Sequence, residues 1–154
     1  MPLTMIEYEL GPLGNRTVLL YDPNKKVGIV IDPAFGCQKV IDDINRLGLN
    51  IDRILITHAH FDHVGGVAEL IRGLNPITGV HLHQDDLALW QAGGGAKNFG
   101  FHIDLNVDIT VDLVDKQIIK LGSEEIIVKQ EELKEDIKCP HCGAVIITKQ
   151  VDYC

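Results

Sequence analysis

The sequence predicts an α/β fold in a single domain. Short apolar runs rich in Val and Ile alternate with segments whose apolar residues recur at helical spacing. The chain has 154 residues, of which 45% are hydrophobic and 23% are charged, and this is the composition of an ordinary globular domain. Aromatic residues make up only 5% of the chain, so we expect an aliphatic core.

The first predicted elements are a hairpin and a helix. Two β-branched runs, residues 17–21 and 27–31, are separated by a turn-forming segment, and Pro33 ends the second strand because proline cannot donate to a ladder. Apolar residues then recur at helical spacing over residues 40–47, and Gly48 is suited to cap that helix.

The later elements continue the alternation. In chain order they are a strand at 53–57, a helix at 64–72, a strand at 80–83, a helix at 85–90, and strands at 109–113, 117–121 and 125–129. Asp85 and Asp86 are candidate N-caps for the helix that they begin. The glycine-rich residues 91–100 have the composition of a mobile loop.

Charge and cysteine content restrict the partners and the cellular compartment. The chain has 14 basic and 22 acidic residues and a net charge of −8, without a basic cluster, so we expect neither nucleic acid nor an anionic membrane as a partner. It shows neither a signal peptide nor an apolar run of about 18 residues, and we expect a cytoplasmic protein. The four cysteines are not spread through the chain as in a secreted disulfide scaffold.

The chemistry is concentrated in residues 57–66, which read THAHFDHVGG. In an extended stretch His58, His60 and Asp62 point to the same side, because side chains alternate with period two, and His63 turns in where the next helix begins. Imidazole and carboxylate donors together suit zinc, iron or manganese. The pattern therefore predicts a metal site.

The position of this segment supports the prediction. The C-terminal end of a strand that leads into a helix is where α/β folds usually bind ligands. Gly65 and Gly66 let the backbone pass close to a metal or substrate without a Cβ clash. The alternative is a histidine-rich surface loop without a role, but such a loop has no reason to lie between a buried strand and a helix.

The T-H-x-H-x-D-H-x-G-G pattern resembles the signature of the metallo-β-lactamase superfamily of metallohydrolases. The resemblance covers roughly residues 5–128. The turn at residues 32–34 (DPA) resembles the Asp-Pro-Gly turn of the family, and residues 11–15 (GPLGN) and 80–86 (VHLHQDD) resemble its glyoxalase II-like branch. The resemblance implies a metallo-β-lactamase-like αβ/βα sandwich, of which residues 1–128 supply mainly the N-terminal half.

The resemblance also implies a site and an activity. His58 and His60 would bind a first metal ion, and Asp62 and His63 a second; the ions would be zinc, one or two of them, with iron or manganese as alternatives. Asp62 would also be catalytic, because it would orient the attacking water. The glyoxalase II-like branch implies a metal-dependent hydrolase for a small-molecule acyl or thioester substrate. Persulfide dioxygenases, which use one iron, share the motif and are an alternative.

The sequence departs from the family after residue 128. Residues 129–138 (KQEELKEDIK) form a charged linker or helix, where family members continue to a third histidine, a bridging aspartate and a last histidine. Catalytic zinc usually has three protein ligands, and the motif leaves two for each ion, so we expect weak activity. The alternative is a non-catalytic metal-binding or interaction protein derived from the same fold.

Residues 139–154 form a cysteine-rich tail with three interpretations. Cys139 and Cys142 have the C-x-x-C-G form of a zinc knuckle, with Cys154 nearby. His141 is the candidate replacement for the missing third histidine. Otherwise the tail is solvated and its thiols are free.

Two further expectations concern burial. A chain that supplies little more than half of a sandwich should leave an apolar sheet face open, so we expect a homo-oligomer in which a second copy covers it. Cys37 follows Gly36 near a helix start, where the pKa of a thiol can fall, although a small buried thiol is the commoner outcome. We expect His81 or His83 at the core edge, and His102 at the surface.

Overall fold

The computed structural model describes residues 2–74 and 79–129, together with the backbone of three short strands nearer the C-terminus. The strands are β1 (Thr4–Leu10), β2 (Asn15–Asp22), β3 (Val27–Ile31), β4 (Asn50–Leu55), β5 (Gly79–Leu82), β6 (Ile109–Val111), β7 (Ile118–Leu121), β8 (Glu124–Val128), β9 (Ile137–Lys138), β10 (Val145–Ile146) and β11 (Val151–Asp152). The helices are α1 (Gln38–Leu47), α2 (Phe61–Val64), α3 (Val67–Gly73) and α4 (Leu87–Gln91), with 3₁₀ turns η1 (Gln84–Asp86) and η2 (Gly93–Phe99).

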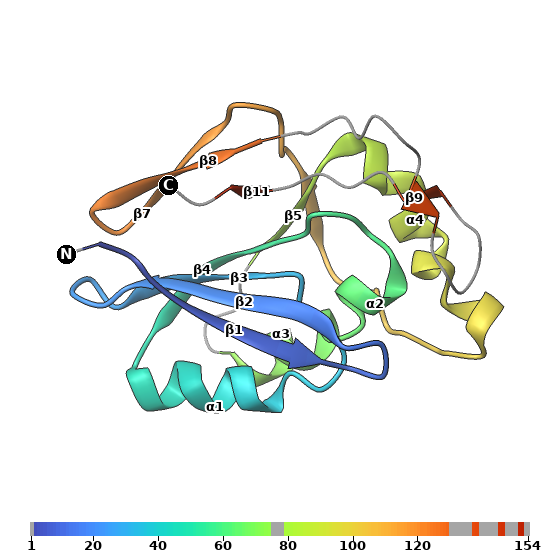
Figure 1. The fold of residues 1–154 in the computed structure, drawn as a ribbon, viewed down its shortest axis with the longest axis horizontal. Coiled ribbons are helices and arrows are strands. Elements are labelled where there is room, and N and C mark those ends of the chain that lie inside the picture. The colour runs from blue at the N-terminus through green and yellow to red at the C-terminus, as the bar shows by residue number, and fades with distance from the viewer. Residues whose placement is uncertain (1, 75–78, 130–136, 139–144, 147–150, 153–154) are drawn as a thin grey trace.

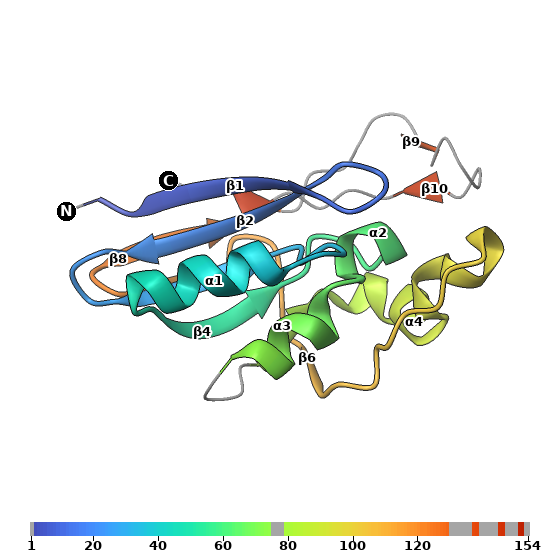
Figure 2. The same ribbon diagram turned by 90° about the horizontal axis from the view of Figure 1, so that it is seen from below.

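A mixed six-stranded sheet in the order β1-β2-β3-β4-β5-β6 organises the molecule. β1, β2 and β3 are antiparallel neighbours, and β3 to β6 run parallel. Helices α1 and α3 lie against one face of this sheet, and the hairpin of β7 and β8 lies over the other (Figures 1 and 2). The predicted α/β class is confirmed, as is the predicted hairpin of β2 and β3.

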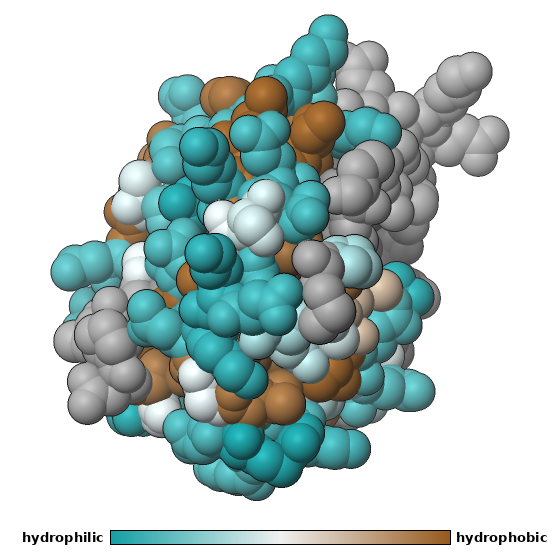
Figure 3. All heavy atoms as spheres, turned by 90° about the vertical axis from the view of Figure 1, so that its left-hand side faces the viewer, coloured by the Kyte–Doolittle hydropathy of each residue, from teal (hydrophilic) through white to brown (hydrophobic). Residues whose placement is uncertain are grey.

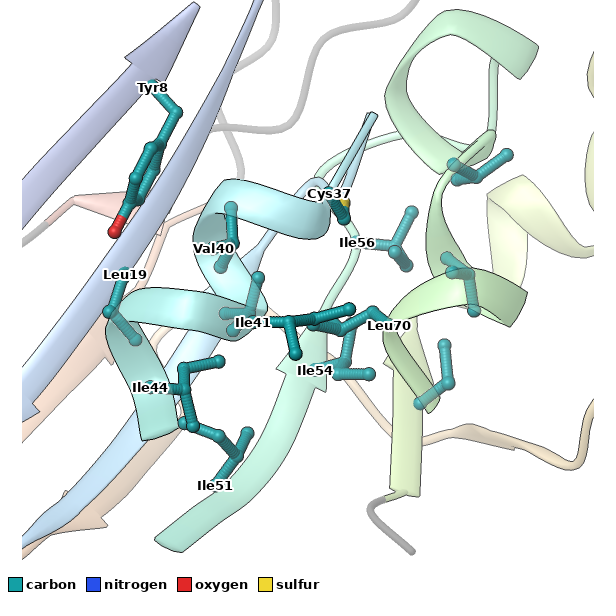
Figure 4. Close-up of a cluster of buried hydrophobic side chains, with 14 of the residues drawn as sticks. Tyr8, Leu19, Cys37, Val40, Ile41, Ile44, Ile51, Ile54, Ile56 and Leu70 are labelled. Carbon is teal, nitrogen blue, oxygen red and sulfur yellow. The ribbon is translucent and has the colours of Figure 1, made fainter. Parts of the chain in front are cut away.

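The first core lies between the sheet and helices α1 and α3. Side chains from both helices meet alternate residues of the strands, as Figure 4 shows for Ile41, Ile54 and Leu70. Each fully buried aliphatic side chain of this kind contributes about 1.5–3 kcal/mol. α1 has the predicted period, and Gly48 ends it with a left-handed φ of 66°, as predicted.

The second core lies on the opposite face of the sheet. Val18, Leu20, Ile29, Ile31 and Leu55 are all buried there against apolar side chains of β7 and β8. The expectation that this face is open is therefore wrong for β2 to β4, because the hairpin covers it.

The homo-oligomer remains a prediction. Val114 and Ile118 are 55% and 60% exposed. Hydrophilic side chains predominate on the face that carries the N-terminus (Figure 3).

One buried carboxylate fastens the hairpin to the sheet. Asp22 ends β2, and its Oδ2 accepts hydrogen bonds of 2.9 Å from the backbone N–H of Ser123 and 2.8 Å from the hydroxyl of Ser123. Its Oδ1 accepts bonds from the N–H groups of Asn24 and Lys25. Gly122 passes so close to Asp22 that a Cβ there would overlap Oδ2.

Several predicted elements differ in their bounds. The strand predicted at 53–57 begins at Asn50 and ends at Leu55, and the helix predicted at 64–72 begins at Val67 and follows the separate turn α2. Asp86 occupies the predicted N-cap position of α4, but its side chain makes no capping hydrogen bond. Instead, His83 Nδ1 accepts a hydrogen bond of 3.0 Å from the N–H of Asp85.

The segment predicted as a mobile loop is the 3₁₀ turn η2. Gly94 within it packs on the backbone of Phe61, since a Cβ on Gly94 would lie 2.7 Å from Phe61 N. Positive φ values at Gly94 and Gly95 allow the chain to fold back here.

Part of the C-terminal segment lies outside the described residues, including Cys139, His141, Cys142 and Cys154. β9 pairs with β10, and β11 pairs with β8. The stretch at 129–138 is described only at residue 129 and in β9. In the described part of the chain, no helix is both long and apolar enough to cross a membrane.

Candidate metal centre

The predicted metal ligands lie beyond the C-terminal end of β4. This end lies beside the end of the parallel strand β3, so the residues that follow the two strands meet. The segment is extended at His60, as expected, and His63 lies in the helix that follows, but α2 begins at Phe61 and so also places Asp62 in a helical turn.

The four predicted ligands lie near one another, but of these only His58 and His63 belong to the described group whose ligand atoms all lie within 4.8 Å of one another. His60 Nδ1 lies 2.5 Å from Asp62 Oδ1, and His63 Nε2 lies 3.9 Å from Asp62 Oδ2. The rings of His58 and His63 are 3.9 Å apart, and those of His58 and His60 are 6.5 Å apart. Asp62 and His63 thus approach the other histidines through a helical turn, whereas the prediction had relied on the alternation of side chains along an extended stretch.

Asp32 joins this cluster and was not among the predicted site residues. One ligand atom from each of Asp32, His58 and His63 lies within 4.8 Å of the others, a spacing that could hold a metal ion. Asp32 Oδ1 accepts a hydrogen bond of 2.8 Å from Thr57 N–H, whereas Oδ2 accepts one from the Thr57 hydroxyl and lies 3.3 Å from His63 Nδ1. Asp32 therefore contacts both Thr57, in the loop after β4, and His63. The sequence feature that could have indicated Asp32 is its position before Pro33 at the end of a buried strand.

His58 provides a test of whether the site fits a metal ion. It is 6% exposed, and its Nε2 is buried without a hydrogen bond to any described residue. Burial and the nearby His63 lower the pKa of His58 to about 4, so its ring is neutral at pH 7. A neutral imidazole nitrogen with a free lone pair is a metal donor, and the site fits such an ion.

The charges of the neighbouring groups agree with this fit. Burial opposes ionisation of Asp62, but hydrogen bonds from His60 and Asn15 lower its pKa overall, so it is a carboxylate. Burial opposes protonation of His63, but the hydrogen bond and charge of Asp32 raise its pKa overall. The negative charges of Asp62 and Asp32 therefore lie next to the imidazoles, where they favour a bound cation.

Gly65 and Gly66 allow close packing against the turn after β3. A Cβ on Gly65 would lie 2.6 Å from the ring of Phe35, and one on Gly66 would overlap the carbonyl oxygen of Ala34. They allow the junction of α2 and α3 to approach the turn after β3, and the expected approach to a metal or substrate stays a prediction.

The remaining histidines lie apart from the cluster. His81 Nδ1 pairs with Asp112 at 2.8 Å between β5 and β6, while His83 caps η1. His102 is exposed, as expected.

Cys37 is buried, and its Sγ donates a hydrogen bond to Ala34 O at 2.9 Å. Burial, then the charge of Glu69, raises the pKa of this thiol to about 12, so the small buried thiol is confirmed and a lowered pKa is not.

Comparison with known proteins agrees with this fold and site. The model of the metallo-beta-lactamase superfamily matches residues 11–143. A hydroxyacylglutathione hydrolase of Trichodesmium erythraeum (strain IMS101) is 44% identical over 66 residues, which cover 42% of this chain and 25% of that protein.

Two solved structures share the architecture. The BLEG-1 B3 metallo-beta-lactamase has a TM-score of 0.69 at 25% identity, covering 81% of this chain and 60% of that one. TTHA1623 in a di-iron-bound form has a TM-score of 0.65 at 30% identity, covering 82% of this chain and 61% of that one. The chain thus spans less than two thirds of each of these relatives. Because the family model extends over most of the sequence and the fold superposes on solved members, the chain belongs to the metallo-beta-lactamase superfamily of metal-dependent hydrolases.

Proposed function

We propose that the chain is a metal-dependent hydrolase that acts on a thioester or a related acyl substrate. The observation that carries the proposal is the buried, unpartnered Nε2 of His58 beside His60, Asp62 and His63. A buried polar atom without a partner costs about 1–3 kcal/mol, and a metal ion at this position would remove that cost.

The residues that would hold the ion are His58, His60, Asp62 and His63. Three imidazoles and a carboxylate suit zinc, which we propose as one or two ions, and they also suit iron or manganese. The di-iron form of TTHA1623 supports iron as an alternative. When bound, such an ion supplies hydroxide at neutral pH and polarises an acyl carbonyl.

The protein groups have defined tasks in this chemistry. Asp62 is a carboxylate at neutral pH because its pKa is lowered, so it can accept a hydrogen bond from a water and orient it. Asp32 engages Nδ1 of His63 at 3.3 Å, which leaves Nε2 of that ring to face Asp62. A hydrogen bond on one ring nitrogen fixes which nitrogen is available to a metal.

The proposed substrate class comes from a relative. The match to a hydroxyacylglutathione hydrolase is short, and it supports a thioester of a small thiol as the first substrate to assay. A chain that bound metal without turning over such a substrate would instead be the non-catalytic metal-binding protein.

The direct test is thioester hydrolysis, followed by release of the thiol, with added Zn²⁺, Fe²⁺ or Mn²⁺. We expect turnover in the unchanged chain and in the His102→Ala variant, whose replaced side chain is exposed. In the His58→Ala/His60→Ala variant we expect only the uncatalysed rate. Equal activity in all three proteins would contradict the proposal.

Metal content separates the histidine cluster from the cysteine tail. Elemental analysis of the Cys139→Ser/Cys142→Ser variant should find the same metal content as in the unchanged chain, and that of the His58→Ala/His60→Ala variant should find less. Metal that disappears with the cysteines would place the ion in a zinc knuckle and remove the basis of the hydrolase proposal.

A further inference from the structure

We propose that Asn15 and Thr17, at the start of β2, are positioning residues that set the two carboxylates of the metal centre. Thr17 sets Asp32, and Asn15 sets Asp62. Neither residue would contact the ion or the substrate. The inference rests on the proposed metal site, although one arm of its test needs no metal.

Thr17 occupies a position where packing alone would suit valine. Alternate residues of a strand share a face, so Thr17 continues the row of Leu19 and Tyr21, which pack in the core beneath α1. Thr17 is fully buried. A hydroxyl at such a position must find hydrogen-bond partners, since burial without them is unfavourable.

The partners of Thr17 are the backbone groups on both sides of Pro33. Thr17 Oγ1 donates to the carbonyl of Asp32 at 2.8 Å and accepts from the N–H of Ala34 at 3.1 Å. Asp32 has a φ of 51°, a left-handed conformation that costs an L-residue roughly 1–2 kcal/mol. The hydroxyl bridge holds the turn in this conformation.

The conformation of the turn decides where the Asp32 carboxylate lies. It brings Oδ1 to the N–H of Thr57 and Oδ2 to Nδ1 of His63. If the bridge from Thr17 is lost, the turn can relax, and the carboxylate moves away from His63. His63 then loses the contact that turns its Nε2 toward Asp62.

Asn15 acts on the backbone of Asp62, the residue that carries the other carboxylate. Its Nδ2 donates to the backbone carbonyl of Asp62 at 3.0 Å. Helix α2 has only four residues, and the last carbonyls of a helix lack partners within it. Asn15 satisfies one of these groups and ties α2 to β2, so both sides of the metal centre are fixed to one strand.

The test compares Thr17→Val with Thr17→Ser, and Asn15→Ala with the unchanged chain. Val keeps the volume and removes both hydrogen bonds, whereas Ser keeps the hydroxyl. Thr110→Val and Asn50→Ala replace exposed residues and serve as matched controls. Co²⁺ titration, read from its visible absorption bands, and Zn²⁺ competition give the affinity and the geometry of the ligands.

We expect Thr17→Val and Asn15→Ala to weaken metal binding by about 10–100-fold and to alter the Co²⁺ bands. Thr17→Ser and both controls should bind like the unchanged chain. Val binding as tightly as Ser would overturn the role of Thr17, and unaltered binding by Asn15→Ala would overturn that of Asn15. If Thr17→Val does not fold, Thr17→Ala takes its place as the test of Thr17. The comparison of Asn15→Ala with Asn50→Ala still tests Asn15.

A second measurement needs no metal. Long-range ¹H–¹⁵N spectra of the histidine rings report the hydrogen bond at His63 Nδ1 in the metal-free chain. We expect its resonance to move in Thr17→Val and to stay in Thr17→Ser and Thr110→Val. An unmoved resonance in Thr17→Val would overturn the inference even if the chain bound metal. A moved resonance in a chain that binds no metal would leave the positioning role standing and refute the proposed function.

Discussion

The Oδ1 atom of Asp32 accepts a hydrogen bond of 2.8 Å from the backbone N–H of Thr57, which joins the turn after β3 to the loop after β4. The two residues are 25 positions apart in sequence. The bond places the Asp32 carboxylate next to the histidine motif. In many proteins, hydrogen bonds from neighbouring residues to the metal ligands set the orientation of those ligands.

Replacement of Asp32 by Asn tests this contact. The amide keeps the size of the side chain and tolerates the positive φ. Its NH₂ group, however, faces Nδ1 of His63, where the carboxylate oxygen of Asp32 accepts a hydrogen bond. We expect a loss of about 10–100-fold in metal affinity and about 1–3 kcal/mol in the free energy of unfolding. Zn²⁺ competition and urea unfolding measure the two effects. Asp108→Asn, at an exposed position, should change neither.

The packing of the α2–α3 junction predicts a difference between two glycines. A Cβ on Gly66 would overlap the backbone carbonyl of Ala34, which cannot move without the turn, whereas one on Gly73 would meet Cδ1 of Ile41 at 2.5 Å. Overpacking usually costs about 1–3 kcal/mol, and the end of a flexible side chain relieves it. Urea unfolding should show a larger loss for Gly66→Ala than for Gly73→Ala. The reverse order would refute the packing role of Gly66.

The buried thiol of Cys37 should be unreactive. Burial and Glu69 raise its pKa to about 12, so the thiolate is scarce at neutral pH. A variant with Cys139, Cys142 and Cys154 replaced by Ser would report Cys37 alone. Iodoacetamide at pH 7.5 should label it in urea but not in buffer. Rapid labelling of the folded protein would contradict this burial.

The same shift has a consequence for stability. The pKa of Cys37 is higher in the folded chain than its ordinary value of about 8.5, so the unfolded chain loses this proton first. The stabilisation of the folded chain by the protonated Cys37 thiol is complete below about pH 8.5 and declines as the pH rises toward 12. Cys37→Ala should reduce the alkaline fall of the melting temperature.

Asp22 predicts a fall of stability in acid. Hydrogen bonds from the backbone of Ser123, the N–H of Lys25 and the hydroxyl of Ser123 lower the pKa of Asp22. Since the unfolded carboxyl has a pKa of about 3.9 and the folded one a lower pKa, the stabilisation that Asp22 contributes is complete above about pH 5 and declines as the pH falls below that value. Asp22→Asn should therefore melt at a lower temperature at pH 7. Its melting temperature should also change less between pH 6 and pH 3, and an unchanged slope would contradict the assignment.

Local patterns were sufficient for much of the fold. Helical spacing and the position of Gly48 predicted α1, and alternating turn and β-branched segments predicted the β2–β3 hairpin. Contacts between distant segments could not be predicted in this way. β7 and β8 cover the sheet through apolar contacts with β2 to β4 and through the pairing of Asp22 with Ser123, and no local pattern encodes these contacts.

The same distinction applies to the site. His58, His60, Asp62 and His63 stand in one short segment, so their clustering was predictable from the sequence. Asp32 enters the cluster because β3 and β4 are parallel neighbours, a fact of topology. The extended geometry expected for the motif holds at His60 but is wrong for Asp62, because α2 begins at Phe61.

The attachment of the β7–β8 hairpin at Asp22 shapes how the chain folds. Asp22 and Ser123 are 101 residues apart, and closing a loop of that length costs about 4 kcal/mol of chain entropy. During synthesis, β1 to β5 emerge well before Ser123 does. The nascent chain therefore carries an uncovered apolar sheet until the hairpin docks, and such intermediates aggregate readily. Substitutions that delay docking should lower the yield of folded protein more than its final stability.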